Sequence, residues 1–481
     1  MNFSDQIDRE EYRLIVTRRY ASEVLVASNG CGWVLPRVEI LPRSRIAEQV
    51  TTEVTAAWGL DAYCLFIPDF SASSRTVRRS NYAVMESVKQ NDEAPKGMCW
   101  MPSTDYGHQL TDPVERHAIR ESFREINSNE GGSMARPFAS PGWLKDLFRW
   151  AQEQLDRLGR RLSGDFRQFD AGPTFCLIRL ETSGPAAWFK ATGEPNIHER
   201  SITLCLARLF PENLPRILGI HSAWNGWLSE EVSDTTLAQC PELSAWERVA
   251  EDLAELQIAS IGKSCALLDA EVKDLRPSKL IDLIPSFFSQ MSELMAVQEK
   301  ESPAPLSIPE LEFLARRLRE ALLFVQSLGF PHTLGHLDFN PGNIVLSPTR
   351  CVFLDWAEAC LTNPFVTFEY LREHFRRAHP EDARTAARVA TAYLRPWTSL
   401  LPADDIEKAL MVSSLIAMFT YAVAIKGGNS PESPDTPKQS AYLRSLTRRM
   451  HHEAIRESSA RSGEGLNSSI LTQPVRSQPP V

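Results

Sequence analysis

The cysteines of this 481-residue chain show no pattern that would link them to one another or to a metal ion. There are nine, an odd number, scattered singly and without a Cys-x-x-Cys pair. A disulfide framework uses paired cysteines and a structural zinc site uses clustered ones. The sequence therefore predicts reduced core cysteines in a cytoplasmic protein.

The chain also lacks a basic excess and an apolar run at its N-terminus. Lysine and arginine number 52 against 61 aspartates and glutamates, which gives a net charge of −9. This balance argues against a nucleic-acid partner bound through a diffuse basic surface. The first ten residues are acidic, so we expect no secretory signal.

A long hydrophobic run is nearly absent as well. Residues 409–425 are uncharged, but they fall short of the about 20 residues that cross a bilayer, and serine, threonine and tyrosine interrupt them. We predict a buried helix here rather than a membrane span, and no membrane partner.

The remaining sequence divides into segments of different composition. Strand-like residues 12–21 and 23–27, with a helical pattern over 46–58 that Gly59 ends, predict an α+β domain over residues 1–130. An Asn-, Ser- and Gly-rich loop over 127–137 predicts a boundary, followed by a linker and connecting helix over 131–162.

A hairpin of strands over 175–181 and 187–191 predicts a small β-rich lobe over 163–232. Amphipathic helical patterns then predict a large helical lobe over 233–457. The Ser-, Gln- and Pro-rich residues 458–481 are expected to be a disordered tail.

The strongest chemical signal is the segment His336-x-Asp338-x-x-x-x-Asn343, followed by a short hairpin that ends at Asp355. Phosphoryl transfer needs a carboxylate for the proton of the attacking hydroxyl and oxygen ligands for Mg²⁺. Asp338 could supply the first, and Asn343 and Asp355 the second. The alternative is that these residues merely form turns. The agreement of spacing, preceding helix and following hairpin favours a site.

These residues resemble the aminoglycoside phosphotransferase and choline kinase family, with its His-x-Asp-x-x-x-x-Asn loop and (Ile/Leu)-Asp-Trp motif, here Leu354-Asp355-Trp356. The resemblance implies a bilobal, protein-kinase-like fold, with ATP and Mg²⁺ as cofactors and a small-molecule hydroxyl as acceptor. It implies Asp338 as catalytic base, His336 as a brace of the loop, and Asn343 and Asp355 as Mg²⁺ ligands.

The chain departs from the family after this motif. Thr362-Asn363-Pro364 stands where members commonly have Gly-Asp-Pro, so loop support or substrate contacts could differ.

The nucleotide-binding half is less clearly marked. Lys190 lies on an apolar strand, where a protein kinase keeps the lysine that contacts the α- and β-phosphates, and Glu199 on the next helix could pair with it. The alternative is a solvated lysine and an unrelated glutamate. The expected phosphate loop, residues 170–174, holds a single glycine, Gly172.

Two further segments leave alternatives open. Residues 224–232 occupy the expected position of the interlobe hinge, although an acidic surface turn fits equally well. The cluster of Arg372, His374, Arg376 and Arg377 could attract an anionic substrate, but a solvated helix face is the preferred interpretation.

The N-terminal domain weakly resembles a Nudix domain, through residues 32–39 and the helix before Gly59. The helix of that family carries clustered carboxylates for a divalent metal. Here Glu53 remains, with Ala56 and Ala57 in place of the metal-binding pair. We expect a Nudix-like fold without hydrolase chemistry, serving as a sensing or docking module; an unrelated α+β domain is the alternative.

The chain is thus predicted to be an α+β protein that transfers the γ-phosphate of ATP to a hydroxyl of a small molecule. The alternative is a catalytically weak pseudokinase that binds nucleotide or metabolite for regulation. The acceptor, the choice of ATP or GTP and the oligomeric state are left open.

Overall fold

The computed structural model describes residues 9–42, 45–68, 81–91, 93–127, 136–233, 235–380, 383–427 and 437–461. It forms two compact units. The first unit comprises Met1–Arg200 and Arg216–Glu231, and the second comprises Ser201–Pro215 and Val232–Val481. Helix α5 (Glu199–Leu209) begins in the first unit and continues into the second.

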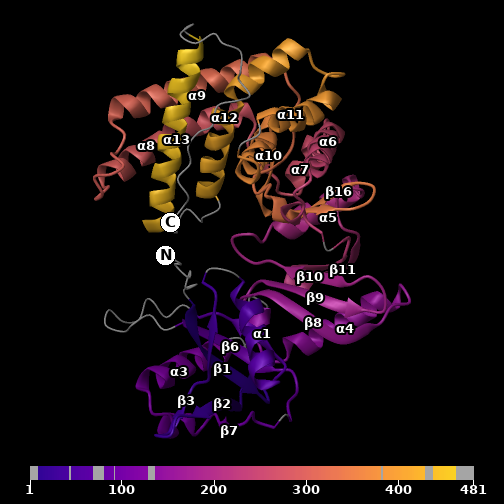
Figure 1. Ribbon diagram of the computed structural model, residues 1–481, viewed down its shortest axis with the longest axis vertical. Coiled ribbons are helices and arrows are strands. Elements are labelled where there is room, and N and C mark those ends of the chain that lie inside the picture. Colours follow the sequence, from indigo (N-terminus) through magenta and orange to yellow (C-terminus); the bar gives the residue numbers. More distant parts are fainter. Residues whose placement is uncertain are drawn as a thin grey trace, which may run out of the picture. The chain divides into compact units, whose positions relative to one another are not determined.

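A seven-stranded sheet forms the N-terminal part of the first unit (Figure 1). Its central path is β3-β2-β1-β6-β5, while β4 pairs with β1 and β7 with β2. Strands β1 and β6 run parallel, and the other pairs are antiparallel. The strands are β1 Glu10–Arg18, β2 Glu23–Ser28, β3 Trp33–Val34, β4 Arg37–Ile40, β5 Ala62–Phe66, β6 Asn81–Ser87 and β7 Met98–Pro102.

Helices cover both faces of this sheet because its central strand is apolar on both sides. Leu14 of β1 belongs to the apolar cluster of α1 (Ile46–Trp58), whereas Ile15 belongs to that of α3 (Pro113–Asn127). The predicted helix over 46–58 is confirmed, and Gly59 ends it in a left-handed conformation, with φ of 63°. A short helix, α2 (Tyr106–Gln109), precedes α3.

A five-stranded antiparallel sheet completes the first unit, in the order β11-β12-β10-β9-β8. The predicted strand over 187–191 is present as β10. The strands are β8 Leu162–Ala171, β9 Cys176–Thr182, β10 Ala187–Ala191, β11 Ile217–His221 and β12 Gly226–Glu230.

The hinge predicted over residues 224–232 is wrong for most of its length. Residues 226–230 are strand β12, which lies between β10 and β11. Its alternating side chains explain this: Leu228 faces Phe189 in the core, and Trp227 pairs with Lys190 on the other face.

The two sheets of the first unit share one apolar core. Phe138 of the turn η1 (Pro137–Ala139) contacts Phe189 of β10 at 6.3 Å between ring centroids, and α4 (Trp143–Asp156) packs in the same cluster. The side chain of Gln168 bonds to the backbone N–H and carbonyl of Cys64 at 2.7 and 2.9 Å. The predicted connecting helix is thus α4, built into the core; of the predicted boundary loop, residues 128–135 lie outside the described residues.

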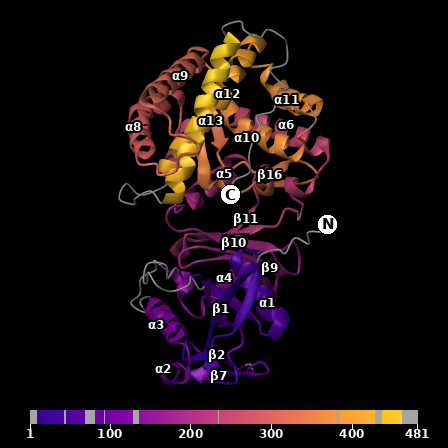
Figure 2. The ribbon, with the colours of Figure 1, turned by 60° about the vertical axis from the view of Figure 1, so that its left-hand side comes forward.

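The second unit is mainly helical, as predicted, with two small sheets of order β13-β17-β14 and β15-β16. Helices α8, α9, α12 and α13 lie side by side in it (Figures 1 and 2). Its elements are η3 Leu237–Gln239, α6 Leu243–Ala259, α7 Ser264–Asp269, β13 Lys273–Asp274, α8 Pro277–Ala296, α9 Ile308–Ser327, β14 Thr333–His336, η4 Pro341–Asn343, β15 Ile344–Leu346, β16 Cys351–Phe353, η5 Trp356–Glu358, β17 Ala359–Thr362, α10 Phe365–Ala378, α11 Ala383–Trp397, α12 Ala403–Gly427 and α13 Pro437–Arg461.

Helix α12 contains the apolar stretch noted in the sequence. Within the described residues, Ala403–Ile425 alone is long and apolar enough to cross a membrane by length and composition, and 56% of its most apolar window is buried inside the molecule. The helix packs against α8, α9, α10 and α13. These contacts are typical of a core helix.

The C-terminal helix corrects one predicted boundary. The disordered tail was expected from residue 458, but α13 continues to Arg461. Ser458 donates to the carbonyl of Ala454 at 2.8 Å, which satisfies its hydroxyl within the helix. The rest of the predicted tail lies outside the described residues.

Candidate functional site

The loop from His336 to Asn343 connects strand β14 to the β15-β16 hairpin in the second unit. Asn340 begins the turn η4, and its Oδ1 accepts a hydrogen bond from the N–H of Gly342 at 2.9 Å. This is the capping that an asparagine provides at the start of a helical turn. The loop is therefore closed by its own side chains.

Two amides hold the carboxylate of Asp338. Asn340 Nδ2 donates to Oδ1 at 3.0 Å, and Asn343 Nδ2 donates to Oδ2 at 3.1 Å. Asp338 is exposed, so the carboxylate faces solvent while the amides set its orientation. An oriented, solvent-facing carboxylate suits a group that must receive a proton from a substrate.

His336 braces this loop from the interior, as predicted. Its Nδ1 accepts from the N–H of Asp338 at 3.1 Å, so the proton belongs on Nε2, which lies 2.9 Å from the carbonyl oxygen of Leu354. The ring is buried, and burial lowers the pKa of His336. A neutral His336 thus ties the backbone of Asp338 to the residue before Asp355.

Asp355 is brought to the loop by the hairpin. The N–H of Leu354 donates to the carbonyl of Asn343 at 2.8 Å, which places Asp355 one residue beyond a direct backbone link to Asn343. Asp355 adopts a left-handed conformation, with φ of 62° and ψ of 64°. Such a conformation in a non-glycine residue costs roughly 1–2 kcal/mol, and these residues concentrate at functional sites.

The oxygen ligands near this loop suit a magnesium ion whose other ligands are water and phosphate oxygens. The described residues contain no group of three His, Cys, Asp or Glu side chains that could hold a metal. The two predicted ligands are instead one carboxylate, of Asp355, and one amide oxygen, of Asn343, whose Nδ2 is turned to Asp338. Mg²⁺ commonly takes one or two protein oxygens and completes its octahedron with water and phosphate oxygens.

The residues that depart from the family pattern have structural partners. Asn363 Oδ1 accepts from the N–H of Phe365 at 3.0 Å, near the start of α10. Thr367 Oγ1 accepts from the N–H of His336 at 2.8 Å. Thr367 thus links α10 to the backbone of the loop at His336.

Lys190 and Glu199 meet in the first unit, and the ion pair expected between them is present. Lys190 Nζ lies 2.5 Å from Glu199 Oε1, and the Glu199 side chain is only 2% exposed. The ammonium also lies over the ring of Trp227, 5.9 Å from its centroid. Lys190 projects from the sheet face opposite to Phe189, whose ring lies in the shared core.

The turn predicted to cover phosphates connects β8 and β9. The N–H of Gly172 donates to the carbonyl of Phe175 at 3.1 Å, within the turn itself. A β-carbon at Gly172 would come within 2.2 Å of the ring of Phe175, so a larger residue here would displace that exposed ring. This glycine therefore serves the turn, and its N–H is already bonded.

The basic cluster on α10 divides into two kinds of residue. The arginines pair along the helix: Arg372 with Glu369, and Arg376 and Arg377 with Glu373. Arg376 and Arg377 fit the solvated helix face that was preferred from the sequence, whereas Arg372 pairs with the carboxylate of Glu369, whose side chain is only 7% exposed. His374 differs because it is half-buried, and burial, with Arg377, lowers its pKa, while Asp338 acts in the opposite direction.

A cluster of three tyrosines in the second unit was missed from the sequence. The Tyr421 ring contacts those of Tyr370 and Tyr442, at centroid distances of 5.7 and 6.3 Å. Burial raises the pKa of Tyr421, with further contributions from Tyr442 and Asp338. No motif marks these residues, which lie on α10, α12 and α13.

The structure thus gathers the predicted site residues in two sets. His336, Asp338, Asn343 and Asp355 come together in the second unit. The pair Lys190–Glu199 forms in the first unit. The structure adds Asn340, which bonds to Asp338, and Trp227, whose ring lies under the ammonium of Lys190.

Comparison with known families agrees with the motif. Residues 199–403 match the model of the family described as "Phosphotransferase enzyme family". The match begins at Glu199 and includes the loop with Asp338 as well as Asp355, whereas Lys190 lies before it. The resemblance predicted from the sequence is confirmed for this segment, and the Nudix-like resemblance stays a prediction.

Several solved structures are similar to this chain at low identity. An ethanolamine kinase of Plasmodium vivax is 13% identical with a TM-score of 0.43, covering 73% of this chain and 92% of its own. A choline kinase of Cryptosporidium parvum is 11% identical with a TM-score of 0.45, covering 67% and 97%. A macrolide 2'-phosphotransferase of Brachybacterium faecium is 13% identical with a TM-score of 0.40, covering 63% and 97%. No curated protein matches the chain significantly.

Proposed function

We propose that the protein transfers the γ-phosphate of ATP to a hydroxyl group of a small molecule, with Mg²⁺ as cofactor, because residues 199–403 match the model of the phosphotransferase enzyme family. The observation that carries the proposal is the carboxylate of Asp338, oriented by the amides of Asn340 and Asn343 within that segment.

Asp338 is the proposed catalytic base. A loose phosphoryl-transfer transition state asks little covalent chemistry of the protein, so positioning of the attacking hydroxyl is the main contribution. Each oxygen of Asp338 already accepts one amide hydrogen and retains a lone pair for a substrate hydroxyl. The amides prevent the carboxylate from rotating away from that hydroxyl.

Asn343 and Asp355 are the proposed ligands of Mg²⁺. When bound, the ion would neutralise charge on the phosphate oxygens. The residues themselves contribute position: the hairpin and the Nε2 of His336 fix the backbone at Leu354, next to Asp355.

Lys190 is the proposed contact for the phosphates of the nucleotide, with Glu199 holding its side chain in place. The ion pair at 2.5 Å and the ring of Trp227 restrict the ammonium. Because the N–H of Gly172 is engaged in its own turn, the lysine would provide a larger share of phosphate binding than in kinases with glycine-rich loops.

The acceptor is proposed to contact His374 and the tyrosines Tyr370, Tyr421 and Tyr442. These side chains are close enough to Asp338 or to one another to affect each other's ionisation. Aromatic rings beside an exposed carboxylate suit a small organic alcohol whose body packs on the rings while its hydroxyl reaches Asp338.

A panel of small alcohols incubated with MgATP tests the proposal, with phosphorylated products detected by mass spectrometry. We expect one class of alcohol to gain a phosphate in the natural protein and not in Asp338→Asn. Absence of ATP binding to the natural protein would refute the proposal.

The engaged N–H of Gly172 favours one second candidate, a nucleotide-binding protein without turnover. In that case MgATP would bind, and binding would weaken in Asp355→Ala, but no alcohol in the panel would be phosphorylated. The same assay therefore separates the two functions.

A further inference from the structure

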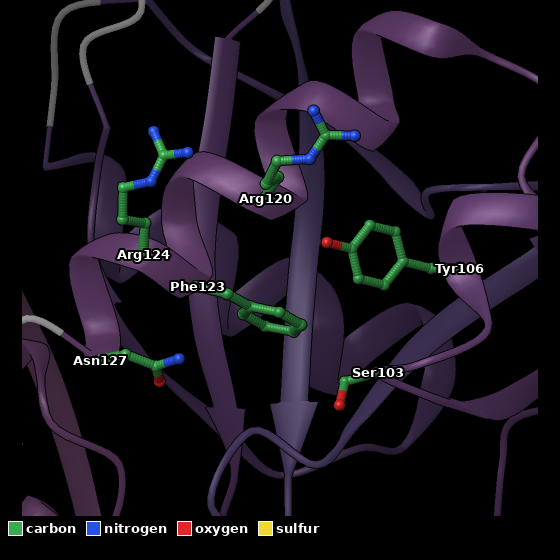
Figure 3. A pocket seen from close by; sticks show the side chains of 6 residues that line it. All are labelled: Ser103, Tyr106, Arg120, Phe123, Arg124 and Asn127. Carbon is green, nitrogen blue, oxygen red and sulfur yellow. The ribbon is translucent and has the colours of Figure 1, made fainter.

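A pocket in the first unit is lined by none of the residues assigned to phosphoryl transfer. Its volume is about 580 Å³, within the range of small-molecule sites. The lining side chains come from α2, from α3 and from the residue that follows β7 (Figure 3): Ser103, Tyr106, Arg120, Phe123, Arg124 and Asn127.

Four of these residues form one stripe of helix α3. Arg120, Phe123, Arg124 and Asn127 follow the spacing i, i+3, i+4, i+7, so they lie along one side of the helix. The buried stripe of α3 is a different one, made by residues such as Ala118, Ile119 and Ile126. The side chains that line the pocket are therefore not the ones that bury α3 against the sheet.

The positive charge of the pocket is only partly compensated. Arg124 pairs with Glu121 on the same helix at 2.7 Å. Arg120 is exposed and, in the part of the chain that the structure describes, has no carboxylate within ion-pair distance. The two arginine side chains extend to the same side of α3 in Figure 3. A guanidinium presents a planar fork of N–H donors that matches phosphate oxygens.

The floor of the pocket is aromatic. The rings of Phe123 and Tyr106 meet edge to face, with centroids 5.9 Å apart and planes at 82°. Both rings are half-buried and pack on the edge of the core shared by the two sheets. The hydroxyl of Tyr106 points into the space beside Phe123 (Figure 3), and Ser103 and Asn127 add further polar groups.

We propose that this pocket binds a small organic anion in which a flat ring carries a phosphate, of the size of a mononucleotide. The ring would pack against Phe123 and Tyr106, and the phosphate would be held by Arg120 and Arg124. The two aromatic rings favour this ligand over inorganic phosphate, which has no ring to pack on them. The two arginines favour it over an uncharged ring compound, which has no phosphate to bind them.

Titration calorimetry with AMP on the full chain tests this proposal, with adenosine and inorganic phosphate as separate probes. We expect AMP to bind at least tenfold more tightly than either probe. The double variant Arg120→Gln/Arg124→Gln should weaken AMP binding at least tenfold. Arg149→Gln is the matched control, because Arg149 is also a helical arginine paired three residues away, with side-chain exposure of 70% against 68% for Arg124.

A second variant separates this pocket from the proposed ATP site. AMP binding should persist in Lys190→Ala, whose substitution lies outside the pocket. The proposal is overturned if AMP does not bind, if Lys190→Ala abolishes binding while the arginine double variant retains it, or if inorganic phosphate binds as tightly as AMP. Circular dichroism of each variant checks that the fold is intact.

Discussion

Asp338 of the second unit and Glu199 of the first are carboxylates in opposite surroundings. Asp338 is exposed and accepts hydrogen bonds from two neutral amides. Glu199 is buried and pairs with the cation of Lys190. Burying a charge is costly unless an opposite charge compensates it, so Glu199 is committed to its partner. An exposed carboxylate with neutral partners stays available to a substrate, and this difference separates a proposed base from a positioning residue.

The largest expected effect follows from removing the proposed base. Asp338→Asn keeps the size and part of the hydrogen bonding of the side chain but cannot accept the hydroxyl proton. We expect kcat to fall by about 10²–10⁴, the usual contribution of a general base. MgATP affinity, measured by calorimetry, should change little. A kcat within a few-fold of the natural protein would remove Asp338 from this role.

The next largest effect is expected on stability, when the cation that pairs with the buried carboxylate of Glu199 is removed. Lys190→Met leaves the carboxylate of Glu199 buried without its cation, which we expect to lower the unfolding free energy by about 2–4 kcal/mol. The double variant Lys190→Met/Glu199→Gln should regain most of that loss, since no charge stays buried. Urea unfolding followed by circular dichroism measures both. Equal stability of the two variants would mean that Glu199 is adequately solvated.

A smaller effect is expected from the amide that orients the base. Asn340→Ala removes the hydrogen bond to Asp338 and the cap of η4. We expect kcat to fall about tenfold, equivalent to about 1.4 kcal/mol, with KM for the acceptor nearly unchanged, because an orienting bond acts on the chemical step. Asn29→Ala is a suitable control, because Asn29 Oδ1 likewise accepts from a backbone N–H two residues on, that of Cys31, and Asn29 belongs to the first unit. A change confined to KM would contradict an orienting role.

The smallest expected effect concerns a third carboxylate, that of Glu86, and its contribution to stability at different pH values. It is buried, and its hydrogen-bond partners in the described part of the chain are neutral: the hydroxyl of Tyr63, the N–H of Gly142 and the amide of Gln90. Burial raises the pKa of Glu86 above its ordinary value, against the opposing hydrogen bonds. A raised pKa contributes stability below pH about 4.5 that is lost as pH rises through the folded value.

Glu86→Gln lacks this titration and is its control. The unfolding free energy of the natural protein, minus that of Glu86→Gln, should therefore decrease from pH 4 to pH 7. Urea unfolding at several pH values measures this difference. A difference that increases with pH would show that hydrogen bonding outweighs burial at Glu86.

Local signals in the chain predicted several elements correctly. The spacing of Ala47, Val50 and Val54 before Gly59 is that of a helix with one apolar face, and α1 ends where the glycine predicts. Residues 226–230 were misassigned because a short run with tryptophan and acidic residues does not show, by itself, that neighbouring strands lie on both sides. The hydrogen-bond partners of β12 are residues 187–191 and 217–221, which a local pattern cannot reveal.

The sequence by itself marked the residues of the His336–Asn343 loop, because Asp338 is held by hydrogen bonds from residues at most five positions away, whereas His336 is also bonded to Leu354 and Thr367. It also marked Lys190 and Glu199, nine residues apart. Only the tertiary structure decided that Thr367 bonds to the backbone of His336, that Tyr421 contacts Tyr370 and Tyr442, and that α3 presents a second polar stripe with Tyr106 beside it. These depend on which helices pack together, and packing is set by the whole apolar surface rather than by any short segment.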